Sequence, residues 1–70
     1  MAANFDALLA SIRQMRDRIY AMSVADATQL LPALTDEAAR VCERAGITDS
    51  HVQRFAADIL DEAVRRRHLA

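Results

Sequence analysis

The sequence has 70 residues, a formal net charge of -1 and a hydrophobic content of 53%. A chain this short is expected to fold as a single domain, residues 1–70, and to keep so much surface exposed that one core gives little stability. The near-neutral charge gives no general attraction to nucleic acid or anionic lipid, and the single cysteine excludes an internal disulfide. We therefore expect self-association or a partner protein to supply part of the stability.

The amino-acid composition predicts an all-α protein. Gly and Pro occur once each, and aromatic residues make up only 4% of the chain, which is typical of helices rather than sheets. The chain has no basic-then-apolar leader and no apolar run near the ~20 residues of a membrane span, which predicts a cytoplasmic protein without membrane contact. It has no metal-ligand spacing and no glycine-rich phosphate loop, so we expect no metal, no cofactor and no catalytic site.

The first helix is expected over about residues 4–22. Asn4 suits the N-cap, and apolar residues follow it with the 3-4-3-4-3 spacing of a helix-packing seam. The residues at these seam positions are Phe5, Leu8, Ile12, Met15, Ile19 and Met22. Leu9 and Tyr20 widen the apolar face beyond what one neighbouring helix covers. The surplus predicts a second contact, between the subunits of a homodimer.

Arg16 interrupts the edge of this apolar face and has two interpretations. Its aliphatic stem could cover apolar surface while the guanidinium reaches solvent. Alternatively, Arg16 and Tyr20, with Arg13 beside them, form the centre of a protein-binding surface, since Arg and Tyr are over-represented among interface hot spots. The partner-binding hypothesis therefore names Leu9, Arg13, Arg16 and Tyr20.

The second helix is expected over about residues 24–45. Ser23 with Asp26 three residues later resembles a capping box. One face then stays apolar as far as Gly46, through Ala27, Leu30, Leu31, Leu34, Ala38, Val41, Cys42 and Ala45. Pro32 projects opposite this face, which favours a bend on the solvent side of a continuous helix over a break near Leu31.

The third helix is expected over about residues 49–67. Gly46 is suited to the left-handed position after a helix, Thr48 is a good N-cap, and Asp49 suits the positive end of the helix dipole. The predicted buried stripe contains Val52, Phe55, Ala56, Ile59, Leu60, Ala63 and Val64. Three helices joined by short turns predict an antiparallel, up-down-up bundle.

Three consecutive arginines, Arg65 to Arg67, lie near the end of this helix. Asp61 with Arg65 and Glu62 with Arg66 have the favoured i,i+4 spacing, and cations suit a helix C-terminus. This accounts for two of the three arginines. The alternative is a clamp for phosphate or for an acidic partner.

The segment Ala38–Ala57 resembles the helix-turn-helix of bacterial repressors. The motif requires, in order, an apolar residue, two small residues, a glycine followed by an apolar residue, and two further apolar residues. The matching residues are Val41, Cys42, Ala45, Gly46, Ile47, Val52 and Phe55. The resemblance implies two helices crossing steeply around a small residue, with the third helix in the DNA major groove. The residues that would face the groove are Ser50, His51, Gln53 and Arg54. Asp58, Asp61 and Glu62 oppose this role, because carboxylates repel phosphates.

The sequence as a whole favours a small, non-catalytic, helical protein–protein interaction module. An adaptor, a chaperone or an inhibitor would fit, in each case as a homodimer with a further protein partner that the sequence does not identify. The alternative is a dimeric helix-turn-helix regulator that binds DNA through residues 38–57.

Overall fold

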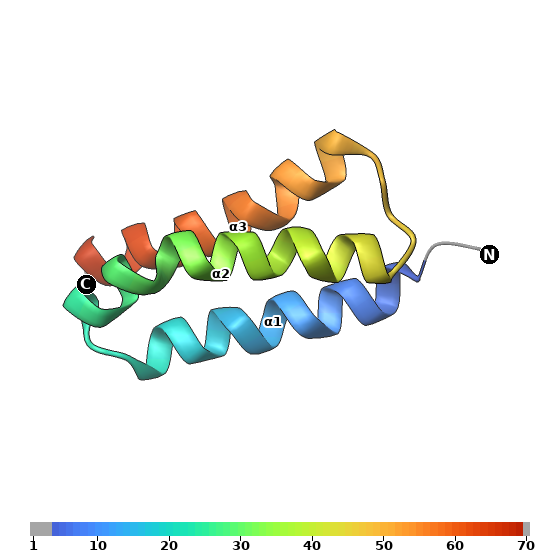
Figure 1. Ribbon diagram of the computed structural model, residues 1–70. Helices are drawn as coiled ribbons and strands as arrows, with labels where there is room; N and C mark the ends of the chain where they lie inside the picture. Colours follow the sequence, from blue (N-terminus) through green and yellow to red (C-terminus); the bar gives the residue numbers. More distant parts are fainter. Residues whose placement is uncertain (1–3, 70) are drawn as a thin grey trace.

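The computed structural model of this protein describes residues 4–69, which form three helices and no strand (Figure 1). They are α1 (Phe5–Ala21), α2 (Val24–Arg44) and α3 (Ser50–Leu69). The helices α1 and α3 run in the same direction, and α2 runs against both. The elongated bundle measures 40 × 18 × 17 Å. The predicted all-α, up-down-up bundle is confirmed, and each predicted helix end lies within two residues of the observed one.

Local hydrogen bonds explain where the first two helices begin. The Oδ1 atom of Asn4 accepts a hydrogen bond from the backbone N–H of Ala7 at 3.0 Å. Ser23 does the same for α2, where its Oγ accepts from the N–H of Asp26 at 3.2 Å. Each cap satisfies a backbone donor that the helix itself leaves unpaired. The two predicted N-caps are confirmed.

The turn between α2 and α3 uses the only glycine of the chain. Gly46 has φ = 76°, a left-handed conformation that costs glycine little. The prediction that Thr48 caps α3 is wrong, because Asp49 Oδ1 accepts from the N–H of His51 at 2.8 Å and α3 begins one residue later, at Ser50. The burial of Ile47, which is only 3% exposed, accompanies a non-helical stretch over 47–49. Asp is also at least as good an N-cap as Thr.

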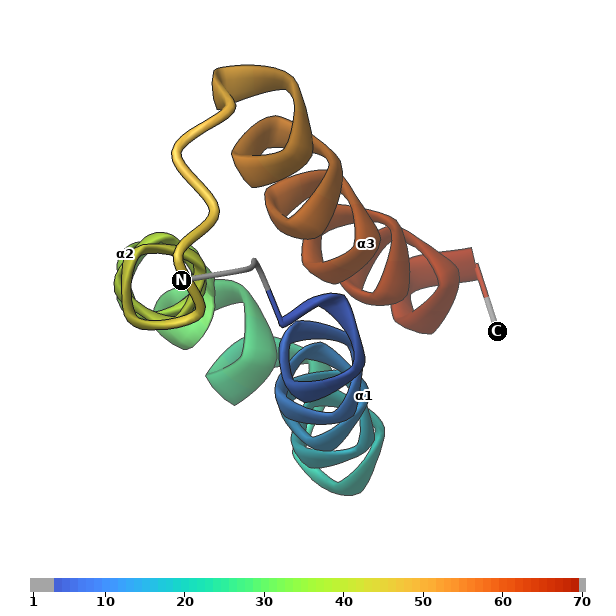
Figure 2. The same cartoon turned by 90° about the vertical axis from the view of Figure 1, so that its right-hand side faces the viewer.

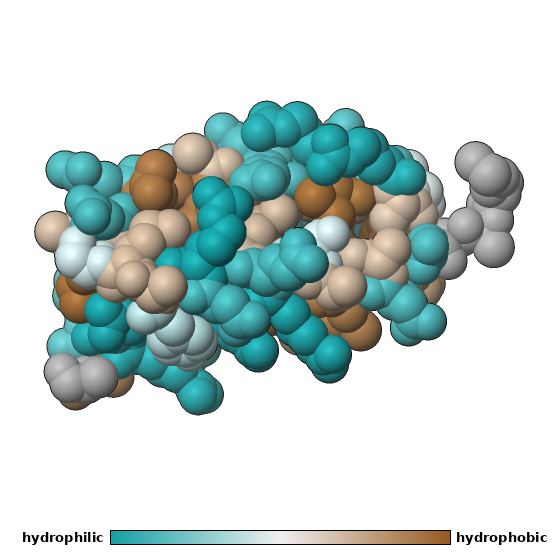
Figure 3. Space-filling model, turned by 90° about the horizontal axis from the view of Figure 1, so that it is seen from below, coloured by the Kyte–Doolittle hydropathy of each residue, from teal (hydrophilic) through white to brown (hydrophobic). Residues whose placement is uncertain are grey.

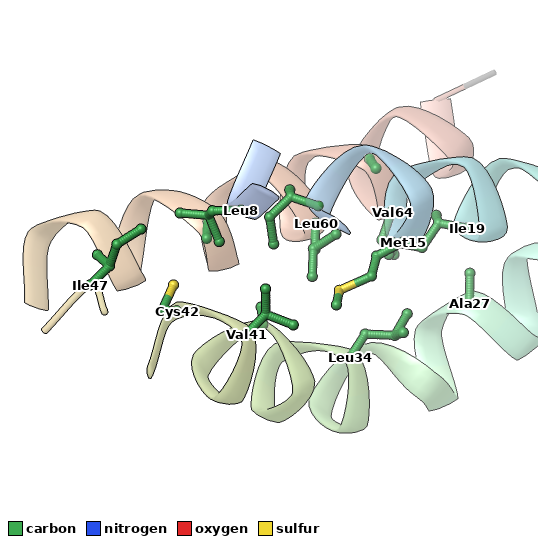
Figure 4. Close-up of a cluster of buried hydrophobic side chains, with 14 residues drawn as sticks. Leu8, Met15, Ile19, Ala27, Leu34, Val41, Cys42, Ile47, Leu60 and Val64 are labelled. Carbon is green, nitrogen blue, oxygen red and sulfur yellow. The ribbon is translucent and has the colours of Figure 1, made fainter. Parts of the chain in front are cut away.

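All three helices contribute side chains to one hydrophobic core (Figure 4). Its buried members are Leu8, Ile12, Met15, Ile19, Ala27, Leu34, Ala38, Val41, Cys42, Ile47, Ala56, Leu60, Ala63 and Val64. Partly buried residues pack around them, namely Met22, Leu31, Ala45, Val52 and Ile59. The centres of the three predicted stripes therefore coincide with the core.

Three predicted stripe residues lie at the surface instead. Phe5 is 53% exposed, Leu30 43% and Phe55 63%. A helix turns by about 100° per residue, so Phe55 points to the flank of α3 while its neighbour Ala56 points into the core. The same rotation places Phe5 and Leu30 at the edges of their stripes. The core arc of each helix is narrower than the full apolar pattern.

The second helix is continuous through Pro32, which is exposed. Proline has no N–H, so the carbonyl of Thr28 lacks its usual helical partner. Figure 2 shows the first turns of α2 displaced from the axis of its later turns, which confirms the predicted bend. The hydroxyls of Thr28 and Thr35 donate to the carbonyls of Val24 and Leu31, a back-bonding pattern that also bends helices.

Hydrogen bonds between distant residues fasten both ends of the bundle. The N–H of Asn4 donates to the carbonyl of Ala45 at 2.9 Å, which joins the start of α1 to the end of α2. At the other end, Nη2 of Arg67 donates to the carbonyl of Met22 at 2.6 Å, and His68 Nε2 lies 3.1 Å from the hydroxyl of Thr28. The last turn of α3 is thereby tied to the α1–α2 turn.

The i,i+4 ion pairs predicted on α3 are confirmed. Arg65 lies 2.9 Å from Asp61, and Arg66 lies 3.2 Å from Glu62. The third arginine, Arg67, donates from Nη2 to the carbonyl of Met22. Across the described residues, no helix is both long enough and apolar enough to pass through a bilayer.

Candidate protein-interaction surface

Most of the large apolar side chains that the bundle leaves at its surface lie along one side. Phe5, Leu9 and Tyr20 of α1 are 53%, 41% and 43% exposed, and Phe55 of α3 is 63% exposed. They line two neighbouring hollows between α1 and α3. We call the surface that contains both hollows the α1–α3 groove.

The first hollow, the apolar hollow, is formed where α1 and α3 begin. It has a volume of about 330 Å³ and is lined almost entirely by apolar atoms. Its lining residues are Phe5, Leu8, Leu9, His51, Val52 and Phe55. The core closes its floor through Leu8, which is only 4% exposed. A solid apolar floor with exposed aromatic walls suits another protein's apolar side chain.

The second hollow, the mixed hollow, continues the groove along the later turns of α1 and α3. Its volume is also about 330 Å³, and it combines apolar side chains with both signs of charge. The lining includes Arg16, Tyr20, Phe55, Asp58, Glu62 and Arg66. Phe55 lines both hollows and joins them. Figure 3, which views the bundle from the α1 side, shows hydrophobic patches interrupted by hydrophilic side chains.

Arg16 is half-buried at the wall of the mixed hollow. Its guanidinium lies 3.9 Å from Asp17, at the limit of an ion pair, and its side chain is 42% exposed. Within residues 4–69, Arg16 makes no ion pair with Asp58 or Glu62, although all three line the same hollow. The mixed hollow therefore holds an arginine and a carboxylate, Asp58, that are not paired with each other.

The structure brings together most of the residues in the partner-binding hypothesis. Arg16 and Tyr20 share the mixed hollow, and Leu9 lines the apolar hollow beside it. Arg13 is exposed but lies outside the lining of both. The α3 side of the groove, above all Phe55, was missed because its apolar spacing had assigned it to the core.

The residues named for DNA contact lie on the first turns of α3. Ser50, His51 and Arg54 are exposed. Gln53 is half-buried, and its Nε2 donates to the carbonyl of Ile47 at 3.3 Å, which turns the side chain back toward the loop.

The helix arrangement departs from the helix-turn-helix pattern in two ways. Phe55, which that pattern places between the helices, is the most exposed large apolar side chain of residues 4–69 except Leu69. In addition, α3 returns along α2, inclined to it, rather than crossing it steeply (Figures 1 and 2). The expectation of a buried Phe55 was wrong, and the steep corner that the resemblance implies is not present. A non-helical stretch over residues 47–49 separates the turn at the end of α2 from the start of α3.

Cys42 is completely buried in the core. Burial raises the pKa of its thiol, and the neighbouring charge of Glu43 raises this pKa further. A thiol with a raised pKa stays protonated and is a poor nucleophile. Within residues 4–69, no group of three or more His, Cys, Asp or Glu residues is placed to hold a metal ion.

Comparison with known proteins gives no match: no family model fits the sequence, and neither a curated protein nor a solved structure resembles it significantly. The chemistry of its own surface therefore carries the functional proposal.

Proposed function

We propose that this protein is a small, non-catalytic protein–protein interaction module that works as a homodimer. The α1–α3 groove is its contact surface. The observation that carries the proposal is that Phe5, Leu9, Tyr20 and Phe55, all exposed, gather in this one groove. Exposed apolar side chains are ordinary when they are scattered, but a contiguous set rimmed by polar residues marks an interaction site.

The size of the chain supports self-association. A standard interface covers about 800 Å² of each partner, which is about a sixth of this chain's accessible surface of 4829 Å². If each copy buries ~500 Å² of apolar surface, the dimer buries ~1,000 Å² in total. At ~25 cal/mol per Å² the hydrophobic free energy of association is on the order of 25 kcal/mol, and the entropic and desolvation costs of association offset most of it. A domain of this size has only ~5 kcal/mol of stability of its own, so a modest net gain matters.

Sedimentation equilibrium over about 1 to 100 μM tests the proposal directly. We expect a monomer–dimer equilibrium, with the dimer predominant at the upper concentration. The Phe55→Ser variant should stay folded, because the side chain is already exposed, and should shift the equilibrium to monomer. Leu30→Ser is the matched control, since Leu30 is 43% exposed but lies on α2 outside both hollows. A wild-type chain that stays monomeric at the upper concentration contradicts the proposal.

Binding of random duplex DNA separates this proposal from the helix-turn-helix alternative. A DNA-binding protein would retain duplex at ~50 mM salt and lose affinity steeply by ~200 mM, because binding releases counterions. We expect no retention at either salt concentration. Retention at low salt that Arg54→Ala abolishes would instead support the DNA-binding alternative.

A further inference from the structure

We infer that the second copy docks in parallel, with the two-fold axis running along the α1–α3 groove, so that α1 of each chain lies on α3 of the other. Arg16 of each copy then faces Asp58 and Glu62 of the other copy. This inference rests on the proposed homodimer and adds its orientation and its polar contacts. The occupant of the groove is a second copy of this chain.

The uneven chemistry of the groove favours the parallel orientation. The end formed by the first turns of α1 and α3 is apolar, and the charged residues lie toward the other end. Parallel docking sets each apolar hollow against the other apolar hollow. Antiparallel docking would set α1 against the second copy's α1 and α3 against its α3. Val52 and Phe55 would then lie toward Glu62 and Arg66 of the second copy, and charges buried against apolar surface lose hydration without a partner.

The two-fold operation also determines which helices meet. The helices α1 and α3 run in the same direction and form the two walls of the groove. A two-fold rotation about an axis parallel to the groove places the α1 wall of one copy against the α3 wall of the other. It leaves the height of each residue along the groove unchanged. Each residue on α1 therefore meets residues of the second copy's α3 from the same level. Phe5 and Leu9 meet Val52 and Phe55 at the apolar end, since all four line one hollow.

The charges of the mixed hollow are self-complementary under this operation. Arg16 lines the α1 wall, and Asp58 and Glu62 line the α3 wall at the same level. Within residues 4–69 Asp58 makes no ion pair, and the nearest carboxylate to Arg16 is that of Asp17, at 3.9 Å. Dimerisation gives Asp58 an ion-pair partner and gives Arg16 a partner to add to its long contact with Asp17, and the two-fold axis forms this contact twice. Ion pairs that lose part of their hydration at an interface set the orientation and the specificity of the contact.

A two-fold contact of this kind closes on itself. Each groove is covered by the other, so no second groove remains to recruit a third chain. The result is a six-helix particle in which Phe55, shared by both hollows, lies near the axis. We expect a dimer as the end point of assembly rather than a longer polymer.

Cross-linking of an equimolar mixture of two single variants tests the orientation. We expect Arg16→Cys chains and Asp58→Cys chains to form a disulfide between chains under mild oxidation. In that mixed dimer the other Arg16–Asp58 contact is intact, which favours the mixed pair over either variant alone. Wild-type chains should form no cross-link, because Cys42 is buried. A mixture of Leu30→Cys with Asp58→Cys is the control and should also give none.

Two other outcomes overturn parts of the inference separately. If Arg16→Cys alone cross-links to itself, or if the mixture fails to cross-link while wild type has the dimer mass, the parallel orientation is wrong and the homodimer stands. If wild type has the monomer mass, the proposed function fails as well.

A charge reversal tests the polar contact by itself. Arg16→Glu should weaken dimerisation about tenfold or more, since it faces two carboxylates across the interface. Arg13→Glu is the matched control, because it makes the same change of charge outside both hollows. It should change the dissociation constant by less than about threefold. Arg16→Glu combined with Asp58→Arg in one chain should recover most of the lost affinity. Equal effects of Arg13→Glu and Arg16→Glu would contradict the contact.

Discussion

Two apolar side chains on α3, five residues apart, differ in what they do for the molecule. Leu60 is fully buried between the three helices, whereas Phe55 is 63% exposed at the junction of two hollows. The same helix therefore serves folding with one face and, in our proposal, association with its flank. The comparison shows that the apolar pattern of α3 is wider than the arc that enters the core, and our proposal assigns the remaining apolar residues to a second contact.

The largest effect is expected in the core. Leu60→Ala removes a fully buried side chain and leaves a cavity, which should lower the free energy of unfolding by about 2–5 kcal/mol. In so small a domain that loss should unfold much of the population at room temperature. Urea denaturation followed by circular dichroism measures it. A loss below ~1 kcal/mol would mean that the core is looser than its burial indicates.

The next largest effect separates association from folding. Phe55→Ser should remove most of the dependence of the melting temperature on protein concentration, because a dimer is stabilised by mass action. At about 1 μM, where wild type is mainly monomeric, the variant and wild type should melt within a few degrees of each other. Differential scanning fluorimetry over a concentration series measures both. Equal destabilisation at all concentrations would show that Phe55 supports the monomer fold.

A smaller effect is expected where α3 is fastened to the α1–α2 turn. Arg67→Ala removes the bond to the Met22 carbonyl and should cost about 1–2 kcal/mol of unfolding free energy. Arg65→Ala is the comparison, because its pair with Asp61 is exposed and should contribute less than ~0.5 kcal/mol. Denaturation of both variants at low protein concentration gives the difference. Equal losses would show that the distant bond adds nothing.

The smallest effect concerns alkaline pH. The raised pKa of the Cys42 thiol means that the unfolded chain loses this proton before the folded chain does. The contribution of Cys42 to the free energy of unfolding is therefore complete below the ordinary thiol pKa of 9.0. It is lost as the pH rises through the higher pKa that the thiol has in the folded chain. We expect the free energy of unfolding to fall above pH 9 more steeply in wild type than in Cys42→Ala. Urea titrations at several pH values measure the two slopes, and parallel slopes would contradict the prediction.

The elements that depend on local chemistry were predictable from the sequence. Asn4 and Ser23 cap helices through hydrogen bonds to residues three positions away, and Gly46 adopts the left-handed conformation that its position required. These interactions involve neighbours in the sequence, so spacing and residue type are sufficient to foresee them. The continuity of α2 through Pro32 follows from the same reasoning, because the ring points away from the apolar face.

Features that depend on the relative orientation of the packed helices were not predictable from the sequence. Whether Phe55 enters the core or remains on a flank depends on how α3 is inclined to the other helices, and the apolar spacing of α3 alone does not give that inclination. The bond between Arg67 and Met22 joins residues 45 positions apart, and the apolar pattern of either helix does not indicate it. The candidate groove was foreseen on its α1 side, through Leu9, Arg16 and Tyr20, and missed on its α3 side.

Complete burial gives Cys42 a further use as a natural reporter. A thiol reagent in solution reaches the sulfur only when the bundle opens, so the labelling rate follows the population of opened molecules. No labelling site has to be introduced into the chain and no denaturant is needed, since Cys42 is its single cysteine. The protein can therefore be monitored in dilute buffer, in lysate or inside a cell by the rate at which one atom is modified.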